Sequence, residues 1–189
     1  MVNKRKKFPK NAKRVFRGEL YEVWQWPQKM FDGSVATFEM LKRPDTAVVI
    51  PVLGDKILIL HQSQPNKPNF LSLAGGRIEP GEKPLNGAKR ELLEETGYVS
   101  RDWKLLQKIN PVGKIVWTIH TYIARDCLYW QPQRLDPGEK IAVKLISYDE
   151  FLQLTDDLNF YEQELIGYML RAQYDKKEYK KFRELLFGK

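Results

Sequence analysis

The sequence predicts an α+β domain in which helices pack on a mixed β-sheet. Two observations predict this class. Short runs rich in valine, isoleucine, leucine and aromatic residues alternate with turn signals, and helix-like segments occur in the middle of the chain and near its C-terminus. Hydrophobic residues make up 42% of the 189 residues, which excludes a disordered chain and allows one domain with a sizeable core.

The predicted strands begin with two hairpins. Asp32-Gly33 and Gly54-Asp55 each separate two apolar runs, which is typical of hairpin turns. Pro65 and Pro68 interrupt the pattern and indicate a loop. The predicted strands cover residues 22–26, 36–41, 46–53, 56–62, 70–76, 103–109, 116–126 and 140–147.

Helix signals follow the strands in two places. Pro84 suits the first turn of a helix, and Gly97 lies just past the end of the same helix. The predicted helices cover residues 84–96, 149–155 and 159–174, with a charged helix or tail from 176 onward.

The positive charge is concentrated at the two ends of the chain. The net charge is +8, yet residues 1–17 alone carry eight Lys/Arg and no acidic residue. The predicted organisation is a basic N-terminal tail over 1–17, N-terminal strands over 18–44, the main domain over 45–174 and a charged helix or tail over 175–189. The basic ends are interpreted as solvated tails. A patch for nucleic acid is the alternative, which we do not favour because no aromatic–glycine RNA-binding pattern accompanies it.

Several classes of protein are excluded or disfavoured. No apolar run reaches the roughly 18–20 residues of a membrane span, so no membrane association is expected. The basic N-terminus lacks the apolar stretch of a signal peptide. Cys127 is the only cysteine, so no intrachain disulfide can form, and a cytoplasmic location is expected.

Three glutamates share one edge of the helix predicted over 84–96. At 100° per residue from Leu85, Glu94, Glu91 and Glu95 fall at about 180°, 240° and 280°, beside the buried face. Clustered carboxylates near a glycine turn suit a hard cation such as Mg²⁺ or Mn²⁺, whereas zinc sites prefer histidine and cysteine. An ordinary charged helix is the alternative reading of these glutamates alone.

The spacing of residues around this helix favours the metal site. From Gly76, five residues lead to Glu82 and seven more to Arg90-Glu91; apolar Leu92, Leu93, Glu94-Glu95, Thr96, Gly97 and apolar Tyr98 follow. This pattern resembles the Nudix box at every specified position over 23 residues. The resemblance implies the Nudix fold, a mixed sheet sandwiched between helices (α/β/α), here with an N-terminal antiparallel hairpin extension. It also implies hydrolysis of a nucleoside diphosphate linked to another group.

The resemblance also implies roles for individual residues. Two or three Mg²⁺ or Mn²⁺ ions would be held by carboxylates and one carbonyl: those of Glu91, Glu94, Glu95, Glu82 and Gly75. Arg90 would orient the glutamates through charge-assisted hydrogen bonds. The catalytic set would consist of Glu94, Glu95 and Arg90 with a base outside the box, for which Glu139 is the candidate and Asp136 the alternative.

Outside the box, the chain resembles the ADP-ribose pyrophosphatase branch, which cleaves ADP-ribose and related nucleotide sugars to a nucleoside monophosphate and a sugar phosphate. This resemblance implies a homodimer in which the N-terminal strands swap between subunits. Trp26 is the candidate for stacking on the base, and Arg43 is the candidate basic residue that contacts the nucleotide. Gln64 is the third candidate for substrate binding, and it stands where many relatives carry arginine. Pro111 only partly matches a proline that marks the branch.

Two other functions remain open at this stage. One is removal of a 5′ diphosphate or cap from RNA, or hydrolysis of another nucleotide by a different kind of Nudix hydrolase. The other is a non-catalytic Nudix module that senses a nucleotide.

Overall fold

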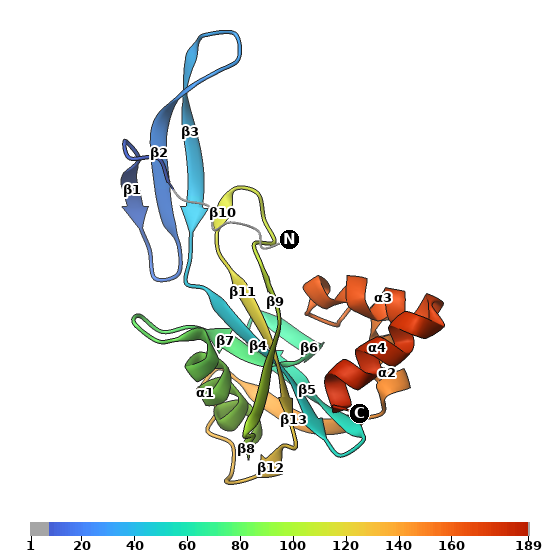
Figure 1. The fold of residues 1–189 in the computed structure, drawn as a ribbon. Helices are drawn as coiled ribbons and strands as arrows, with labels where there is room; N and C mark the ends of the chain where they lie inside the picture. The colour runs from blue at the N-terminus through green and yellow to red at the C-terminus, as the bar shows by residue number, and fades with distance from the viewer. Residues whose placement is uncertain (1–7, 189) are drawn as a thin grey trace.

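The computed structural model describes residues 8–188, and its core is a mixed β-sheet with helices on both faces (Figure 1). The strands are β1 (Lys13–Arg17), β2 (Glu22–Lys29), β3 (Val35–Lys42), β4 (Thr46–Leu53), β5 (Lys56–Gln64), β6 (Lys67–Ser72), β7 (Ala74–Arg77), β8 (Tyr98–Val99), β9 (Asp102–Ile109), β10 (Ile115–Val116), β11 (Ile119–Arg125), β12 (Leu128–Tyr129) and β13 (Lys140–Ile146). The helices are α1 (Pro84–Thr96), α2 (Tyr148–Gln153), α3 (Ile166–Tyr174) and α4 (Lys176–Phe187), with 3₁₀ turns at Leu154–Asp156 and Gln163–Leu165.

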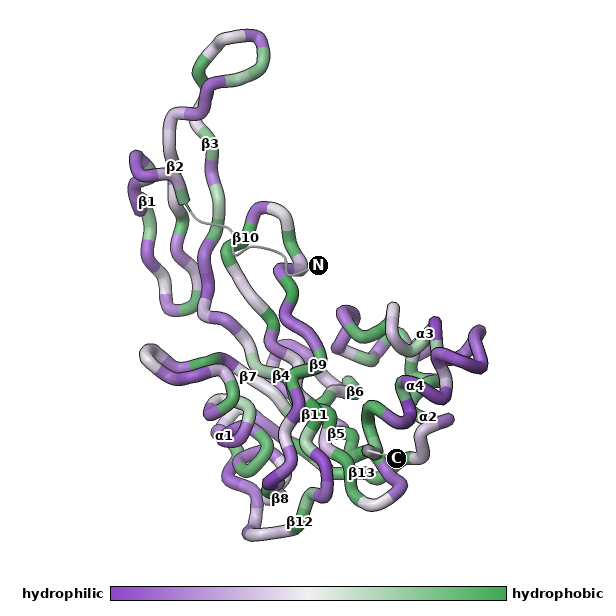
Figure 2. The backbone as a smooth tube through the Cα atoms, in the orientation of Figure 1, coloured by the Kyte–Doolittle hydropathy of each residue, from purple (hydrophilic) through white to green (hydrophobic). Residues whose placement is uncertain are grey.

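The main sheet has the order β13-β5-β4-β11-β9, with β6 added to β5 and β7 added to β4. Strands β4 and β11 pair in parallel, whereas β4 with β5 and β11 with β9 pair antiparallel, so the sheet is mixed as predicted. Figure 2 shows that apolar residues concentrate in these central strands.

Side chains on the central strands alternate between two apolar cores. Ile57 and Ile59 of β5 belong to the core beneath α2, α3 and α4, whereas Leu58 and Leu60 belong to the core beneath α1. Figure 1 shows α1 on one side of the sheet and α2 to α4 on the other. The α+β class and the α/β/α arrangement predicted from the sequence are therefore confirmed.

The N-terminal strands form a second sheet of order β1-β2-β3-β10, which extends away from the main domain in Figure 1. The predicted hairpin is present and is longer than predicted, because β2 and β3 pair from Glu22↔Lys42 out to Lys29↔Val35. The predicted basic tail over 1–17 differs from the structure: Lys13–Arg17 forms β1 and pairs with β2. Residues 1–7 of that predicted tail lie outside the described residues.

The strand predicted over 116–126 is divided into β10 and β11, which belong to different sheets. Two further elements also differ from the prediction. The single strand predicted over 70–76 is divided at Leu73, since the chain leaves its partner β5 in β6 and pairs with β4 in β7. The helix predicted over 159–174 begins only at Ile166. Its first residues instead run beside β6, where the Leu71 N–H donates to Asn159 O at 3.0 Å and the Tyr161 N–H donates to Leu71 O at 2.9 Å. These hydrogen bonds hold residues 159–161 along β6, so the helix starts later than predicted.

The C-terminal segment forms α4, which starts where the Asp175 side chain accepts hydrogen bonds from the Lys177 and Glu178 N–H groups. Arg125 of β11 fastens the other end of α4: its guanidinium donates to the carbonyls of Leu185 at 2.7 Å and Leu186 at 3.1 Å. Within residues 8–188, no helix is both long and apolar enough to cross a membrane.

Candidate active site

Helix α1 has the predicted bounds, and both of its ends follow from local sequence. Pro84 occupies the first turn, where its missing N–H removes no helical bond. Gly97 ends the helix in the left-handed region at φ 77°, and its N–H donates to Leu93 O at 2.9 Å. The buried face of α1, which includes Ala88 and Leu92, sets the rotation of the helix. This rotation places Glu91 and Glu95 against the glycine-containing strand β7.

The glycines of β7 bring the backbone close to α1. The Gly75 N–H donates to Glu95 Oε2 at 2.8 Å, so it points away from the partner strand β4. In an antiparallel pair, a residue that does not donate to its partner also directs its carbonyl to the free side. The Gly75 carbonyl therefore faces the same edge as Glu95, as a metal ligand at that position requires.

Gly76 leaves room for the Glu91 carboxylate. A Cβ at position 76 would lie 2.5 Å from Glu91 Oε1 and 2.7 Å from its Cδ. Any side chain at this position would therefore displace Glu91. This close approach gives a physical reason for glycine at the first position of the box.

Arg90 ties the acidic edge together. Its Nη1 donates to Glu91 Oε1 at 2.8 Å and to Glu94 Oε2 at 3.0 Å. Its Nε and Nη2 each donate to the Glu82 carboxylate at 3.2 Å, and Nη2 also donates to Arg77 O at 2.8 Å. Arg90 therefore contacts Glu82, Glu91 and Glu94 together, and its hydrogen bonds lower the pKa of Glu82.

Glu91 and Glu95 are the two most buried glutamates of α1, and burial raises the pKa of both. Glu95 is only 5% exposed, and burial raises its pKa to about 9 even though it accepts the Gly75 N–H. Burial also raises the pKa of Glu91 despite the neighbouring Arg90. A bound cation would reverse both shifts, because it would stabilise the ionised carboxylates.

The donor set fits Mg²⁺ or Mn²⁺. The carboxylates of Glu91 and Glu95 lie along the edge between α1 and β7, beside the Gly75 carbonyl, and oxygen donors are the chemistry that hard cations prefer. Among residues 8–188, no three acidic, histidine or cysteine side chains already surround a single point. The contacts of Arg90 explain this arrangement, since Glu91 and Glu94 both turn toward its guanidinium.

Glu139 lies near the same edge on a loop that is fastened to the end of α1. The Arg134 N–H donates to Glu94 O at 2.8 Å, and Gln133 Nε2 donates to Glu95 O. Glu139 lies close enough for its charge to add to the raised pKa values of Glu91 and Glu95. Its carboxylate accepts from the Asp136 N–H at 3.2 Å, and Asp136 itself is exposed.

The other predicted binding residues lie on different elements. Trp26 belongs to the N-terminal sheet, where it is only 7% exposed and packs against Phe38 and Phe8. Arg43 lies between β3 and β4 with its Cζ 4.4 Å from the centre of the Trp117 ring. Its Nε is buried and has no hydrogen-bond partner within residues 8–188. Gln64 is exposed at the end of β5. The structure therefore joins the box residues and Glu139, and leaves Trp26 apart from them in its own sheet.

Sequence reasoning missed Glu162, a buried glutamate in the segment beside β6. It lies close enough to the site for the charge of Glu95 to contribute to its raised pKa. The only sequence signal was an acidic residue inside a segment predicted as an amphipathic helix, where glutamate is common.

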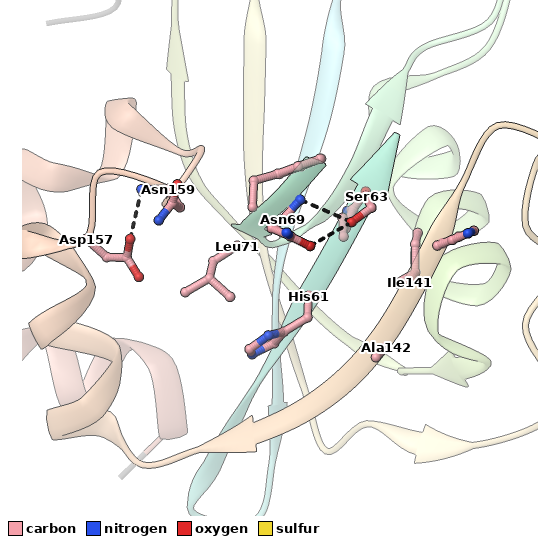
Figure 3. A pocket seen from close by; sticks show the side chains of 11 residues that line it. His61, Ser63, Asn69, Leu71, Ile141, Ala142, Asp157 and Asn159 are labelled. Carbon is pink, nitrogen blue, oxygen red and sulfur yellow. Dashed lines mark hydrogen bonds between the residues drawn. The ribbon is translucent and has the colours of Figure 1, made fainter. Parts of the chain in front are cut away.

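The groove in Figure 3 is separate from this site. It lies over the face of β5 opposite α1 and is lined by His61, Leu71, Ala142, Asp157 and Asn159 among others. None of the predicted site residues lines it.

Comparison with known families identifies the class of this protein. The family model described as NUDIX domain matches residues 42–166, so the chain belongs to the NUDIX family. With its complete box and the arrangement of α1 against β7, the chain is a Nudix hydrolase.

The chain is also similar to individual members of the family over most of its length. The chain is 25% identical over 152 residues to the ADP-ribose pyrophosphatase of Bacillus subtilis (strain 168), an alignment that covers 78% of this chain and 82% of the relative. It is 25% identical over 160 residues to the methanol dehydrogenase activator of Bacillus methanolicus, covering 82% and 86%. A crystal structure of an ADP compounds hydrolase shares the fold at a TM-score of 0.72 and 20% identity, covering 89% of this chain and 94% of that one.

Proposed function

We propose that this Nudix hydrolase cleaves the pyrophosphate bond of a nucleoside diphosphate linked to a second group, with ADP-ribose or a related nucleotide sugar as the substrate. The products are a nucleoside monophosphate and a sugar phosphate. The observation that carries the proposal is the buried acidic edge of α1, where Glu91 and Glu95 meet the free side of β7. Such an edge suits a cation that also binds phosphate oxygens.

The residues at this edge have distinct tasks in the proposed reaction. Mg²⁺ or Mn²⁺ would be held by Glu91, Glu94, Glu95 and the Gly75 carbonyl, and Glu82 would act through Arg90. When bound, the ions neutralise the phosphate oxygens and increase the acidity of a coordinated water. Arg90 keeps Glu91 and Glu94 aligned, and Glu139 is the residue we propose to accept the proton of the attacking water.

The adenosine part of the substrate is supported by the relatives. The B. subtilis relative is an ADP-ribose pyrophosphatase, and the structural neighbour is an ADP compounds hydrolase. We propose that Arg43 contacts the nucleotide, since its Nε is buried without a partner among residues 8–188 and its Cζ lies over the Trp117 ring.

We propose that the chain works as a homodimer in the cytoplasm. The N-terminal sheet exposes several large apolar side chains on β1, the β2–β3 turn and β3: Val15, Phe16, Phe31 and Val35. A second subunit would cover such side chains. Trp26 would then be the residue that stacks on the base in the active site of the other subunit. Size-exclusion chromatography with light scattering should give twice the mass of one chain. A monomer at micromolar concentration would contradict this part of the proposal.

The substrate is tested by a hydrolysis screen with Mg²⁺ and with Mn²⁺. The panel contains ADP-ribose, other nucleotide sugars, dinucleotides, nucleoside triphosphates and triphosphorylated RNA, and the products are separated by chromatography. We expect ADP-ribose or another nucleotide sugar to be cleaved fastest, to a nucleoside monophosphate and a sugar phosphate. Activity confined to triphosphates or RNA would overturn the substrate assignment.

The assignment of the glutamates is tested by Glu95→Gln, with Glu178→Gln as the control in the first turn of α4, where the side chain is partly exposed and pairs with Lys181. Glu95→Gln should lower kcat at least about 100-fold, since it removes a charge that positions the cation. The control should retain the wild-type rate. Unchanged turnover in Glu95→Gln would show that the site lies elsewhere.

A further inference from the structure

Glu162 is a buried acid with an unexplained position. Glu162 is only 4% exposed, and its Oε2 has no hydrogen-bond partner among residues 8–188. Burial, together with the charges of Glu164 and Glu95, raises its pKa well above the ordinary value. An apolar residue would fill the same place without this cost, so the packing of the core does not account for a glutamate here.

The backbone around Glu162 places its carboxyl group at the junction between β6 and β7. The N–H of Leu71 donates to Asn159 O, and the carbonyl of Leu71 accepts from the Tyr161 N–H. Phe160 thereby forms a parallel bridge with Leu71. The chain is therefore held beside β6 immediately before Glu162. From there the Glu162 carboxyl accepts the N–H of Leu73, the residue at which the strand passes from one partner to the next.

Glu162 and Glu95 bind alternate residues of one extended segment, namely Leu73 between β6 and β7 and Gly75 in β7. The Leu73 N–H is bound by Glu162 and the Gly75 N–H is bound by Glu95 at 2.8 Å. In extended backbone, N–H groups two residues apart point to the same edge. The two acids therefore fasten successive N–H groups on one edge, and the charge of Glu95 reaches Glu162. Between them lies Ala74, followed by the carbonyl of Gly75 that faces the site.

We propose that Glu162 is a positioning residue of the active site. By holding the Leu73 N–H, it fixes the extended segment from Leu73 to Gly75 and so keeps the Gly75 carbonyl and N–H aligned with Glu95. This inference rests on the proposed cation site between α1 and β7. It assigns the effect to the hydrogen bond with Leu73, and a negative charge on Glu162 is not needed for it.

Two substitutions distinguish the effect of the length of the Glu162 side chain from the effect of its charge. Glu162→Gln keeps the length of the side chain and an oxygen that accepts the Leu73 N–H, but it has no charge. Glu162→Asp keeps the carboxyl group but is one methylene shorter, so it withdraws from Leu73. Both fit in the space of the original side chain. Glu164→Gln is the matched control, because Glu164 lies in the same segment and no N–H of β6 or β7 donates to it.

The measurement is the affinity for Mn²⁺ alone, followed by electron paramagnetic resonance, with kcat and KM for ADP-ribose as a second reading. Glu162→Asp should weaken Mn²⁺ binding by about 10-fold or more, the usual effect of losing a group that orients a metal ligand. It should lower kcat more than it changes KM. Glu162→Gln and Glu164→Gln should stay within about 3-fold of the wild type, well below that effect.

The reverse order would overturn the proposal. If Glu162→Asp binds Mn²⁺ as the wild type does, or if Glu162→Gln is the weaker of the two, the hydrogen bond to Leu73 does not position the site. Failure of the wild type to cleave ADP-ribose would contradict the proposed substrate only, because the Mn²⁺ comparison needs no substrate. Failure of the wild type to bind Mn²⁺ would remove the cation site and this inference with it.

Discussion

At the scale of single residues, the close approach of Gly76 to Glu91 does most to shape the acidic edge. The space that a Cβ would take at position 76 is filled by the Glu91 carboxylate. Arg90 then holds that carboxylate from the other side at 2.8 Å. Glu91 is therefore fixed between a backbone without a side chain and a guanidinium, and its position depends on both.

Gly76→Ala should weaken metal binding while the fold is retained. The new methyl group would meet Glu91 Oε1 at 2.5 Å, and the flexible end of Glu91 is the part that can move away. We expect the Mn²⁺ dissociation constant to rise by about 10-fold or more, as for other changes that misplace a metal ligand. Calorimetric titration with Mn²⁺ measures it.

Gly167→Ala is the control for this substitution. A Cβ at position 167 would meet only Arg171 Nη1, at 3.5 Å, and alanine favours helix over glycine. This variant should bind Mn²⁺ normally and should be more stable by up to about 1 kcal/mol. Equal Mn²⁺ binding by both alanine variants would show that Gly76 does not make room for a ligand.

Cys127 gives a prediction about pH. Burial raises the pKa of its thiol to about 12, and its Sγ donates to Ala124 O at 3.3 Å. The reactive species is the thiolate, so the folded protein should not react with a thiol reagent between pH 7 and about 10, and should react once unfolded. Absorbance with a disulfide reagent, with and without denaturant, measures this. Rapid labelling of the folded chain at pH 8 would contradict the buried position.

At the scale of elements, local signals predicted what depends on local chemistry. Pro84 and Gly97 gave the bounds of α1, and Gly54 gave the turn of the β4–β5 hairpin with φ 59°. What the sequence could not predict depends on contacts between distant residues. Residues 159–162 have a helical pattern, yet the free edge of β6 binds them in extended form. The strand change at Leu73 likewise depends on which of β4 and β5 offers a free edge.

Arg125 joins two elements that are far apart in the sequence. It donates to the last carbonyls of α4, at Leu185 and Leu186, and to Asp102 at 2.9 Å. Arg125→Met retains most of the apolar stem but removes all of these donors. We expect a loss of about 1–3 kcal/mol in the free energy of unfolding, because the carbonyls lose charge-assisted partners. Urea denaturation measures it, and an unchanged midpoint would mean that α4 is held by its apolar face alone.

At the scale of the whole molecule, the candidate site is assembled from three parts of the chain. Helix α1 supplies the glutamates, and β7 supplies the backbone groups. The loop that carries Glu139 is hydrogen-bonded to the end of α1 through Arg134 and Gln133. The box spacing predicted the first two parts, since they are neighbours in sequence. Glu139 came from resemblance, and Glu162 was missed because only the folded chain brings it to Leu73.

The central claim is that the edge between α1 and β7 binds divalent cations that in turn bind a pyrophosphate. Crystals grown with Mn²⁺ and a non-hydrolysable ADP-ribose analogue test it most directly, through the anomalous scattering of manganese. The account predicts manganese peaks in contact with Glu91, Glu95 and the Gly75 carbonyl, with the pyrophosphate beside them. An occupied nucleotide site with no manganese at this edge would contradict it.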